Sequence, residues 1–447
     1  MLGNNANLLY GILITSGHRS AVELCARTKL SQPAVSRALS EIAKITGRLV
    51  THRNGRSIVY AIAKQIRSLP AVVSIHQITR EGNSSDALFG TLTALEGGGY
   101  IFIGNDNRSE LFEGLPWFLQ DMRPQGYIGR AFCHAYSDKL GLSNSLSEWS
   151  DDDVIYALSM LGEDSPGNLI VGNVAWQRFL TSNHEIPLSS EGQIDYYDSI
   201  ADAVVHGGVP GSSAAGEHPK FLARYIEADN VRNVIVKFSP LLEESTVAVR
   251  WKDLLIAEHL ALETLKANGL DVPQTRIIIS GKRCYFESER FDRVGLKGRI
   301  GTVSFDAIDN AFIGSRRTWA ASATVLRSNA MIDRDCEEQI RLVELFGRCI
   351  ANTDMHFGNL SFYWDAPTSR SVRFTLAPLY DMLPMLYAPE KSEVVHRVFN
   401  LPSGTEYGKA GELAYSFWNR VSSHENVSNA FKEIAIANAG LLSRALS

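Results

Sequence analysis

The sequence predicts an α+β protein in which a small winged helix-turn-helix domain precedes a larger, two-lobed body. Three observations support this prediction. Near the N-terminus, two short helical segments flank a tight turn, and an Asn-Gly hairpin signal follows them. In the middle of the chain, a loop rich in glycine and serine leads into two β-rich runs. Farther on, a polar loop lies between two apolar segments, at residues 352–359.

The composition is typical of a soluble, well-packed protein with two or three domains. The chain has 447 residues, of which 45% are apolar and 21% are charged. Its five cysteines are scattered, without the spacing of metal ligands, and no uninterrupted apolar stretch reaches the roughly 18 residues that span a membrane. We therefore expect reduced thiols, a cytoplasmic location and no membrane partner.

The charge is distributed unevenly along the chain. The first 69 residues carry ten Lys/Arg and two acids, a net charge of +8, whereas the remainder carries 34 bases and 47 acids. A basic head on an acidic body indicates that the head contacts a polyanion.

The head, residues 1–68, is predicted to bind DNA. Helices are expected at residues 8–16, 20–28 and 32–43, and the wing is a hairpin turned at Asn54-Gly55. Short polar side chains on the third helix suit base edges, and arginines at the wing suit phosphates. The expected contacts are Gln32, Ser36, Arg37, Arg53 and Arg56. A homodimer on a palindrome is common for such domains, and a helical protein-interaction module is the alternative function.

The first lobe of the body is predicted at residues 75–245. Residues 75–135 mix short strands with turns, and their aromatic side chains are expected in the core: Trp117, Phe118 and Tyr127. The segment Gly207–Phe221, GGVPGSSAAGEHPKF, lets backbone N–H groups approach phosphate oxygens, although it is not a Walker A motif. Strands are expected at residues 220–225 and 231–238.

The second of these strands ends in Val-Ile-Val-Lys, which is the order found in a kinase N-lobe after its glycine-rich loop. In a kinase, the strand lysine binds the α- and β-phosphates of ATP and pairs with a helix glutamate. Lys237 occupies the lysine position, and a helix is expected at residues 250–268. Glu258 is the best candidate partner for Lys237, and Glu263 is its rival.

The second lobe, residues 246–447, is predicted to be mainly helical, with Trp418 as a core anchor. Asp354 and Asn359 are five residues apart in the polar loop, the spacing of a kinase catalytic loop. There the Asp accepts the proton of the attacking hydroxyl and the Asn holds a metal. Asp381 follows an apolar run 22 residues after Asn359, where a kinase places its second metal-binding Asp. ATP and Mg²⁺ are therefore the expected ligands.

Together these motifs resemble the HipA family of bacterial serine/threonine kinases, the toxins of type II toxin–antitoxin pairs. The resemblance spans residues 75–430 and rests on GSSAAGEHPKF, VIVKF, ANTDMHFGN and LAPLYDM, with ERFDR between the lobes. The typical family member has no DNA-binding domain and relies on a separate helix-turn-helix antitoxin. A fused head resembles the HipH (YjjJ) type, so the need for a separate antitoxin partner stays open.

The resemblance implies a bilobal protein-kinase-like (HipA-like) fold and a role for each matching residue. Asp354 looks like the catalytic base, and Asn359 and Asp381 look like the Mg²⁺ ligands. Ser213, with Ser212 as a second candidate, matches a serine whose autophosphorylation ejects the loop and inactivates the kinase. His356 is more readily explained as a residue that holds the loop. The implied ATP-binding set is Lys237, Glu258, His356, Ser213, Ala214, Ala215 and Gly216.

Three functions remain open at this point. The first is a kinase toxin that phosphorylates a translation component, for which the resemblance indicates an aminoacyl-tRNA synthetase. The second is a DNA-binding transcriptional regulator with a kinase-like sensor body. The third is a DNA-acting, nuclease-like toxin in which Asp354, His356 and Asp381 hold a metal. The presence of Lys237 and Asn359 favours the first, because neither of the others requires them.

Overall fold

The computed structural model describes the chain except for residues 55–56, 84–87, 183–187, 190–191, 207–217, 229, 244, 365–371, 392 and 404–405. It divides into two compact units. Unit 1 comprises Met1–Thr79, Asn83–Arg123 and Ser137–Asn183. Unit 2 comprises Arg80–Gly82, Pro124–Tyr136 and His184–Ser447. Residues 75–245, predicted from the sequence to form one lobe, are divided between the two units. The domain boundaries proposed from the sequence stay predictions.

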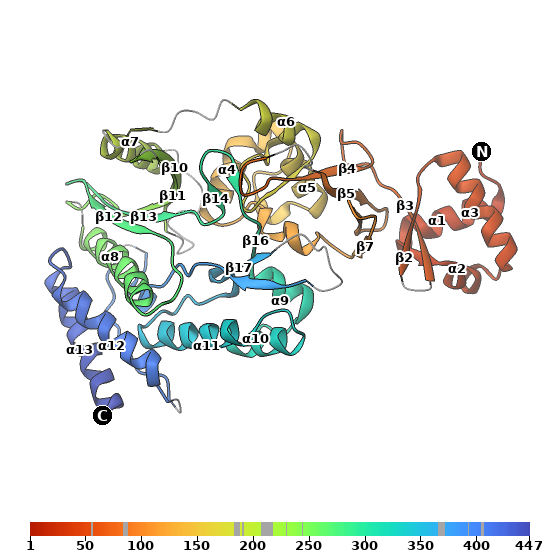
Figure 1. Cartoon of the computed structure of the whole chain (residues 1–447). Coiled ribbons are helices and arrows are strands. Elements are labelled where there is room, and N and C mark those ends of the chain that lie inside the picture. The colour runs from red at the N-terminus through yellow and green to blue at the C-terminus, as the bar shows by residue number, and fades with distance from the viewer. Residues whose placement is uncertain are drawn as a thin grey trace. The chain divides into compact units, whose positions relative to one another are not determined.

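The head of unit 1 has three helices and a small antiparallel sheet (Figure 1). The helices are α1 (Asn4–Ser16), α2 (Ala21–Thr28) and α3 (Gln32–Thr46). The sheet has the order β1-β3-β2, with bounds Arg19–Ser20, Ser57–Ile62 and Leu49–Asn54. Helix α3 runs three residues past its predicted end, because Gly47 supplies the left-handed C-cap at φ 63°. This is the predicted helix-turn-helix followed by a hairpin.

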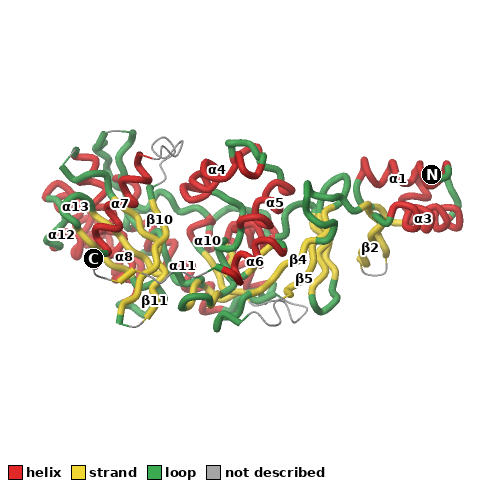
Figure 2. The backbone as a smooth tube through the Cα atoms, turned by 90° about the horizontal axis from the view of Figure 1, so that it is seen from above, coloured by secondary structure: helices red, strands yellow, loops and turns green. Residues whose placement is uncertain are grey.

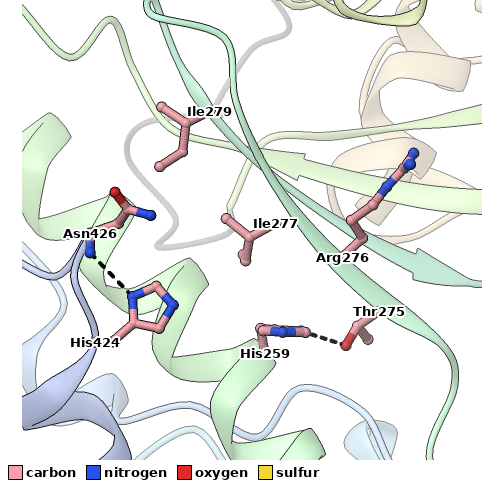
Figure 3. A pocket seen from close by; sticks show the side chains of 7 residues that line it. All are labelled: His259, Thr275, Arg276, Ile277, Ile279, His424 and Asn426. Carbon is pink, nitrogen blue, oxygen red and sulfur yellow. Dashed lines mark hydrogen bonds between the residues drawn. The ribbon is translucent and has the colours of Figure 1, made fainter.

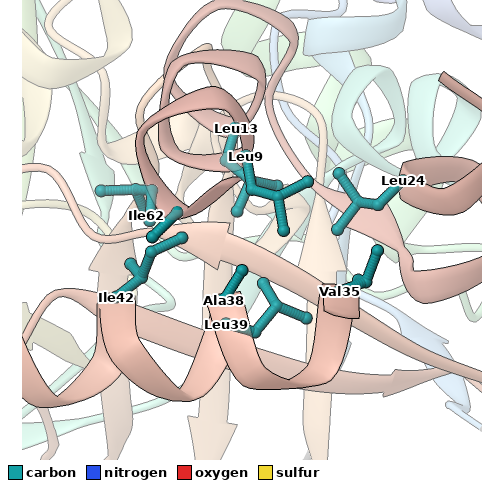
Figure 4. Packing of buried hydrophobic residues seen from close by; sticks show 9 residues of the cluster. Leu9, Leu13, Leu24, Val35, Ala38, Leu39, Ile42 and Ile62 are labelled. Atoms are coloured by element: carbon teal, nitrogen blue, oxygen red, sulfur yellow. The ribbon is translucent and has the colours of Figure 1, made fainter. Parts of the chain in front are cut away.

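One apolar cluster holds the head together (Figure 4). All three helices and β3 contribute to it, and each side chain is buried: Ala6, Leu9, Leu13, Leu24, Val35, Ala38, Leu39, Ile42 and Ile62. The head also joins the rest of unit 1 through backbone hydrogen bonds, from Lys64 N to Ala94 O at 2.7 Å and from Glu96 N to Ile62 O at 2.8 Å. The end of β3 therefore continues into the neighbouring sheet.

That neighbouring sheet has five antiparallel strands in the order β7-β6-β5-β4-β8. Their bounds are β4 Val73–Gln77, β5 Leu88–Ala94, β6 Tyr100–Gly104, β7 Ser109–Phe112 and β8 Leu169–Val171. The associated helices are η1 (Trp117–Met122), η2 (Leu146–Glu148), α5 (Asp151–Leu161) and α6 (Asn173–Thr181). Trp117 and Phe118 are buried, as expected.

The strand-and-turn prediction for residues 75–135 was wrong at its end. Helix α4 (Gly126–Leu140) begins directly after the Pro124-Gln125 turn and contains Tyr127, which is buried as expected. Gly126, the first residue of α4, has a φ of 63°, a value that glycine adopts without strain.

The first part of unit 2 is a sheet of order β12-β13-β11-β10-β9 with one helix on each face. The strands are β9 Leu188–Ser189, β10 Lys220–Glu227, β11 Asn230–Phe238, β12 Thr275–Ile279 and β13 Cys284–Glu289. Helix α7 (Gln193–His206) packs Tyr197 and Ala201 against alternate residues of β11. Helix α8 (Thr246–Lys266) meets the opposite face, where Lys237 reaches Glu258.

The rest of unit 2 is mainly helical (Figure 2). Its helices are α9 Phe305–Phe312, α10 Trp319–Ser328, α11 Arg334–Cys349, η3 Phe357–Asn359, η4 Met385–Tyr387, α12 Gly408–Ser423 and α13 Asn429–Leu446. Its strands are β14 Arg293–Val294, β15 Gly298–Arg299, β16 Thr302–Ser304, β17 Ser361–Trp364 and β18 Phe374–Leu376. Trp418 is fully buried and donates to Cys349 O at 3.2 Å, so α12 anchors the end of α11.

No disulfide links the five cysteines. Among the helices of the described ranges, none has the length and apolar character needed to cross a membrane.

Truncating Leu9 tests the core of the head. Leu9 is fully buried, so Leu9→Ala is expected to lower the free energy of unfolding of the head by about 3 kcal/mol. Leu8 is 49% exposed, so Leu8→Ala is a matched control with an expected change below about 0.5 kcal/mol. Thermal unfolding followed by circular dichroism measures both, and equal losses would contradict the packing described here.

Candidate active site

Two lysines lie next to each other at one end of the β10–β11 hairpin. The antiparallel register pairs Lys220 directly with Lys237, so both side chains point to the same face of the sheet. Because Val236 and Phe238 enter the core beside α7, Lys237 projects to the opposite face, toward α8. Lys220 was not among the site residues predicted from the sequence. Its place at the start of a strand, directly after the glycine-rich loop, was the signal that could have identified it.

Lys237 forms ion pairs with two acids that are far apart in the sequence. Its Nζ lies 2.7 Å and 2.8 Å from the two carboxylate oxygens of Glu258, and it also donates to Oδ1 of Asp381. Lys237 is 9% exposed and Glu258 is 1% exposed. The structure thus pairs Lys237 with Glu258, whereas Glu263 contacts Lys266 at 3.7 Å. Removing one member of such a buried pair leaves an uncompensated charge, so the three groups depend on one another.

The three charges differ in how tightly they hold protons. Burial raises the pKa of Asp381, but the charges of Lys237 and then Lys220 outweigh it and bring the pKa to about 2. Burial also raises the pKa of Glu258. This effect is larger than the lowering caused by the charge of Lys237, so the pKa is raised to about 7. Burial lowers the pKa of Lys237, but Asp381 and Glu258 outweigh it and raise the pKa above its usual range. Asp381 is therefore the ionised carboxylate best suited to bind a cation.

Asn352 connects the polar loop to Asp381. Its Nδ2 donates to the backbone oxygen of Asp381 at 3.1 Å, and its Oδ1 accepts from the backbone N–H of Asp354 at 3.1 Å. Asp381 has a φ of 54°, in the left-handed region that few residues other than glycine adopt. The bond from Asn352 helps to hold this backbone conformation. The sequence analysis placed Asn352 in the polar cluster without a role, because both of its partners are set by tertiary structure.

The remaining polar residues shape the loop itself. Asn359 is buried, and its Nδ2 donates to the backbone oxygen of Asp354 at 2.7 Å, a bond that does not use its Oδ1. Nδ1 of His356 accepts from the Gly358 N–H at 3.1 Å and caps η3, which is a loop-holding contact. The hydroxyl of Tyr380 donates to the Gly358 oxygen at 2.7 Å. These bonds fix the loop while Asp354 stays exposed at its surface.

The predicted phosphate loop lies mostly outside the described residues. This applies to Ser212, Ser213, Ala214, Ala215 and Gly216. At the end of the loop, the imidazole of His218 packs against Trp251, with ring centroids 4.4 Å apart and ring planes tilted by 47°. Burial, followed by the charges of Lys237 and Lys220, lowers the pKa of His218 to about 3. A neutral histidine therefore stands beside the two lysines, a feature that the sequence analysis missed.

These groups offer ligands for a metal ion and for phosphate groups. Asp381 and Asn359 offer the carboxylate and amide oxygens that Mg²⁺ prefers, and Lys237 and Lys220 offer the positive charge that phosphates need. The exposed carboxylate of Asp354 can accept a proton. The two-part fold and these groups define a protein of the protein-kinase-like class.

Eight of the ten basic residues of the head form two groups, while Arg19 is half-buried and Arg56 lies outside the described residues. Arg48, Lys64 and Arg67 form ion pairs within unit 1, with Glu96, Asp152 and Asp153. A second group is exposed: Arg27, Lys29, Arg37, Lys44 and Arg53. Of the predicted DNA contacts, Gln32, Ser36, Arg37 and Arg53 are exposed, and Arg56 lies outside the described residues. Part of the head's positive charge is thus used inside unit 1.

Comparison with known proteins identifies the family. Residues 69–180 match the family model of the YjjJ-like toxin middle domain, and residues 212–439 match that of the HipA-like C-terminal domain. Over 430 residues, the chain is 33% identical to Toxin YjjJ of Escherichia coli K12, which covers 95% of this chain and 94% of that protein. The chain therefore belongs to the HipA family, in its YjjJ-like branch.

A solved structure supports the predicted fold. In the complex of Shewanella oneidensis MR-1 HipA, HipB and its operator DNA, one chain matches with a TM-score of 0.52 at 15% identity. The match covers 83% of this chain and 96% of that one. At this level of identity the likeness concerns the fold alone, and it confirms the prediction of a HipA-like, kinase-like body.

Replacing Asn352 tests its link to Asp381. Asn352→Ala removes a buried donor and a buried acceptor, so it is expected to lower the free energy of unfolding by about 2 kcal/mol. The neighbouring Thr353 is exposed, and Thr353→Ala is the matched control, with an expected change below about 0.5 kcal/mol. Urea denaturation measures both. An Asn352→Ala protein as stable as the control would contradict the role assigned to these bonds.

Proposed function

We propose that this chain is a serine/threonine protein kinase that uses ATP and Mg²⁺. The observation that carries the proposal is the bonding of Lys237 to both Glu258 and Asp381. Kinase chemistry requires a strand lysine, a helix glutamate and a metal-binding aspartate in one place. A nuclease-like site needs acids around a metal, but it has no use for a buried lysine held by a helix glutamate.

Each residue has a distinct role in this proposal. Lys237 and Lys220 bind the nucleotide phosphates, while Glu258 holds Lys237 in position. Asp381 and the amide oxygen of Asn359 would hold Mg²⁺, and the positive charges of Lys237 and Lys220 lower the pKa of Asp381, which favours its ionised form. Asp354 accepts the proton of the attacking hydroxyl, and its exposure gives a protein side chain access. Bound Mg²⁺-ATP supplies the phosphoryl group.

We also propose autophosphorylation at Ser213 or Ser212 as the means of regulation. The loop that carries both serines ends at His218 and Lys220, beside Lys237. A phosphate group of about −2 charge on this loop competes for the lysines that bind ATP phosphates. Phosphorylation is therefore expected to turn the kinase off.

The proposed partners follow from the family and from the head. A translation component, with an aminoacyl-tRNA synthetase as the candidate from family resemblance, is the proposed protein substrate. The Shewanella HipA complex contains HipB and operator DNA, which supports DNA and an antitoxin as partners. Here the head of the chain itself presents Gln32, Ser36 and Arg37 on an exposed helix surface.

Phosphotransfer tests the main proposal. With labelled ATP and Mg²⁺, the purified chain is expected to label itself, and mass spectrometry should place the phosphate on Ser213 or Ser212. Asp354→Asn should reduce labelling about 1,000-fold, since it removes the general base. Asp335→Asn makes the same chemical change at an exposed position of α11 and should leave labelling intact. If the wild-type chain neither labels itself nor binds ATP, the kinase proposal is refuted.

DNA binding is tested by comparing two basic residues of the head. Arg37 is exposed on α3, so Arg37→Ala is expected to weaken DNA binding about tenfold. Lys64 pairs with Asp152, so Lys64→Ala makes the same change in net charge with little expected loss. Fluorescence anisotropy with duplex DNA at fixed salt measures both. Equal losses would show that net charge alone governs the binding.

A further inference from the structure

A pocket lies in unit 2 between α8, β12 and the turn that joins α12 to α13 (Figure 3). Its volume is about 610 Å³, within the range of small-molecule sites. It is lined by His259 of α8, by Thr275, Ile277 and Ile279 of β12, and by His424 and Asn426 of the turn. We call it the His259–His424 pocket. None of its residues belongs to the candidate active site.

Strand alternation gives the pocket an apolar floor. Ile277 and Ile279 lie on the same face of β12 as Thr275, and Figure 3 shows Ile277 between the two histidines and the strand, with Ile279 farther along, near Asn426. Arg276 also lines the pocket, but its guanidinium is held elsewhere, by Glu287 at 2.7 Å and Gln193 at 3.0 Å. The polar groups that can meet a ligand are therefore the imidazoles, the Asn426 amide and the Thr275 hydroxyl.

Each histidine is oriented by a bond through its Nδ1. His259 Nδ1 lies 2.8 Å from the Thr275 hydroxyl oxygen, and His424 Nδ1 accepts from the backbone N–H of Asn426 at 3.3 Å. When His424 is neutral, its proton is therefore on Nε2. These bonds leave the Nε2 edge of each ring for a ligand.

The surroundings of the pocket are more positive than negative. Burial lowers the pKa of His259, Glu263 raises it, and His424, Arg420 and Lys266 lower it. Burial also lowers the pKa of His424, Glu425 raises it, and Lys432 and Lys252 lower it. Lys266 and Glu263 pair with each other at 3.7 Å, which leaves three cations, Arg420, Lys432 and Lys252, against Glu425. A ligand that carries negative charge relieves this imbalance, and the isoleucine floor accommodates an apolar group beside the charge.

The pocket and the candidate active site share helix α8. His259 directly follows Glu258, so consecutive residues of α8 face the pocket and Lys237. Six residues before His259, Asp253 of α8 accepts hydrogen bonds from the backbone N–H of Ser428 at 2.9 Å and from the Ser428 hydroxyl, so α8 is bonded to the start of α13. A ligand that bridges His259 and His424 adds a second tie between α8 and the same turn.

We propose that the His259–His424 pocket binds a small organic anion, and that its occupancy steadies α8 and favours nucleotide binding at Lys237. The anionic group meets the two imidazoles and the Asn426 amide, and the apolar part rests on Ile277 and Ile279. The coupling to nucleotide rests on the proposed kinase function, whereas the binding site itself does not.

Calorimetry with benzoate and phenyl phosphate tests the site and separates carboxylates from phosphates. Each probe that binds the full chain is expected to bind the His259→Gln/His424→Gln variant about tenfold or more weakly, since two hydrogen bonds are lost. His396→Gln, at an exposed histidine of unit 2, is the matched control and should not alter binding. The single variants serve the same purpose if the double variant does not fold.

Two results would overturn the site. One is the absence of binding by both probes. The other is loss of phenyl phosphate binding in Lys237→Met without loss in the double variant, because the probe would then occupy the nucleotide site. Benzoate avoids this competition, because it carries no phosphate.

The coupling is measured with a fluorescent ATP analogue and Mg²⁺. Saturating benzoate is expected to tighten analogue binding about fivefold in the wild type and not in the double variant. Benzoate binding that requires both histidines but leaves nucleotide affinity unchanged would overturn the coupling and keep the site. If the analogue fails to bind under any condition, the proposed function and the coupling both fail, while benzoate binding still decides the pocket.

Discussion

The buried ammonium of Lys237 is the constraint on which the rest of unit 2 depends. A lysine removed from water is stable only if opposite charges meet it at close range. Glu258 and Asp381 provide them, one from a helix that lies against the sheet and the other from a loop 144 residues farther along the chain. The sheet, α8 and the loop at Asp381 must therefore all be in place for the charge to be tolerated.

The local structure around Asp381 follows from the same requirement. Its backbone adopts a left-handed conformation, and Asn352 binds its carbonyl oxygen while also binding the N–H of Asp354. The side-chain amide of Asn352 thus connects Asp381, the proposed metal ligand, to Asp354, the proposed general base. The loop is fixed by bonds from side chains to the backbone, and Asp354 is an exposed residue of this loop.

Charge has a different use in unit 1. The basic head meets the acids Glu96, Asp152 and Asp153 of the adjoining domain, and these contacts use Arg48, Lys64 and Arg67. The exposed arginine and lysine side chains on and around α2, α3 and the wing make up the surface that a polyanion can meet. The net charge of the head, counted from the sequence, overstates the positive charge that is available to a polyanion. Ion pairs within the unit use part of this charge, and they cannot be predicted from composition.

The sequence by itself determined the classes of most elements, with α4 as an exception, and the identity of the main candidate residues. The Asn54-Gly55 turn and the spacing of Asp354, Asn359 and Asp381 are local features of the chain. Tertiary structure alone decided that Glu258, not Glu263, meets Lys237, since both lie on the same helix and only packing against β11 selects one. It also decided the roles of Lys220, Asn352 and the His259–His424 pocket. Those contacts join residues distant in sequence or set by strand register, so no local pattern carries them.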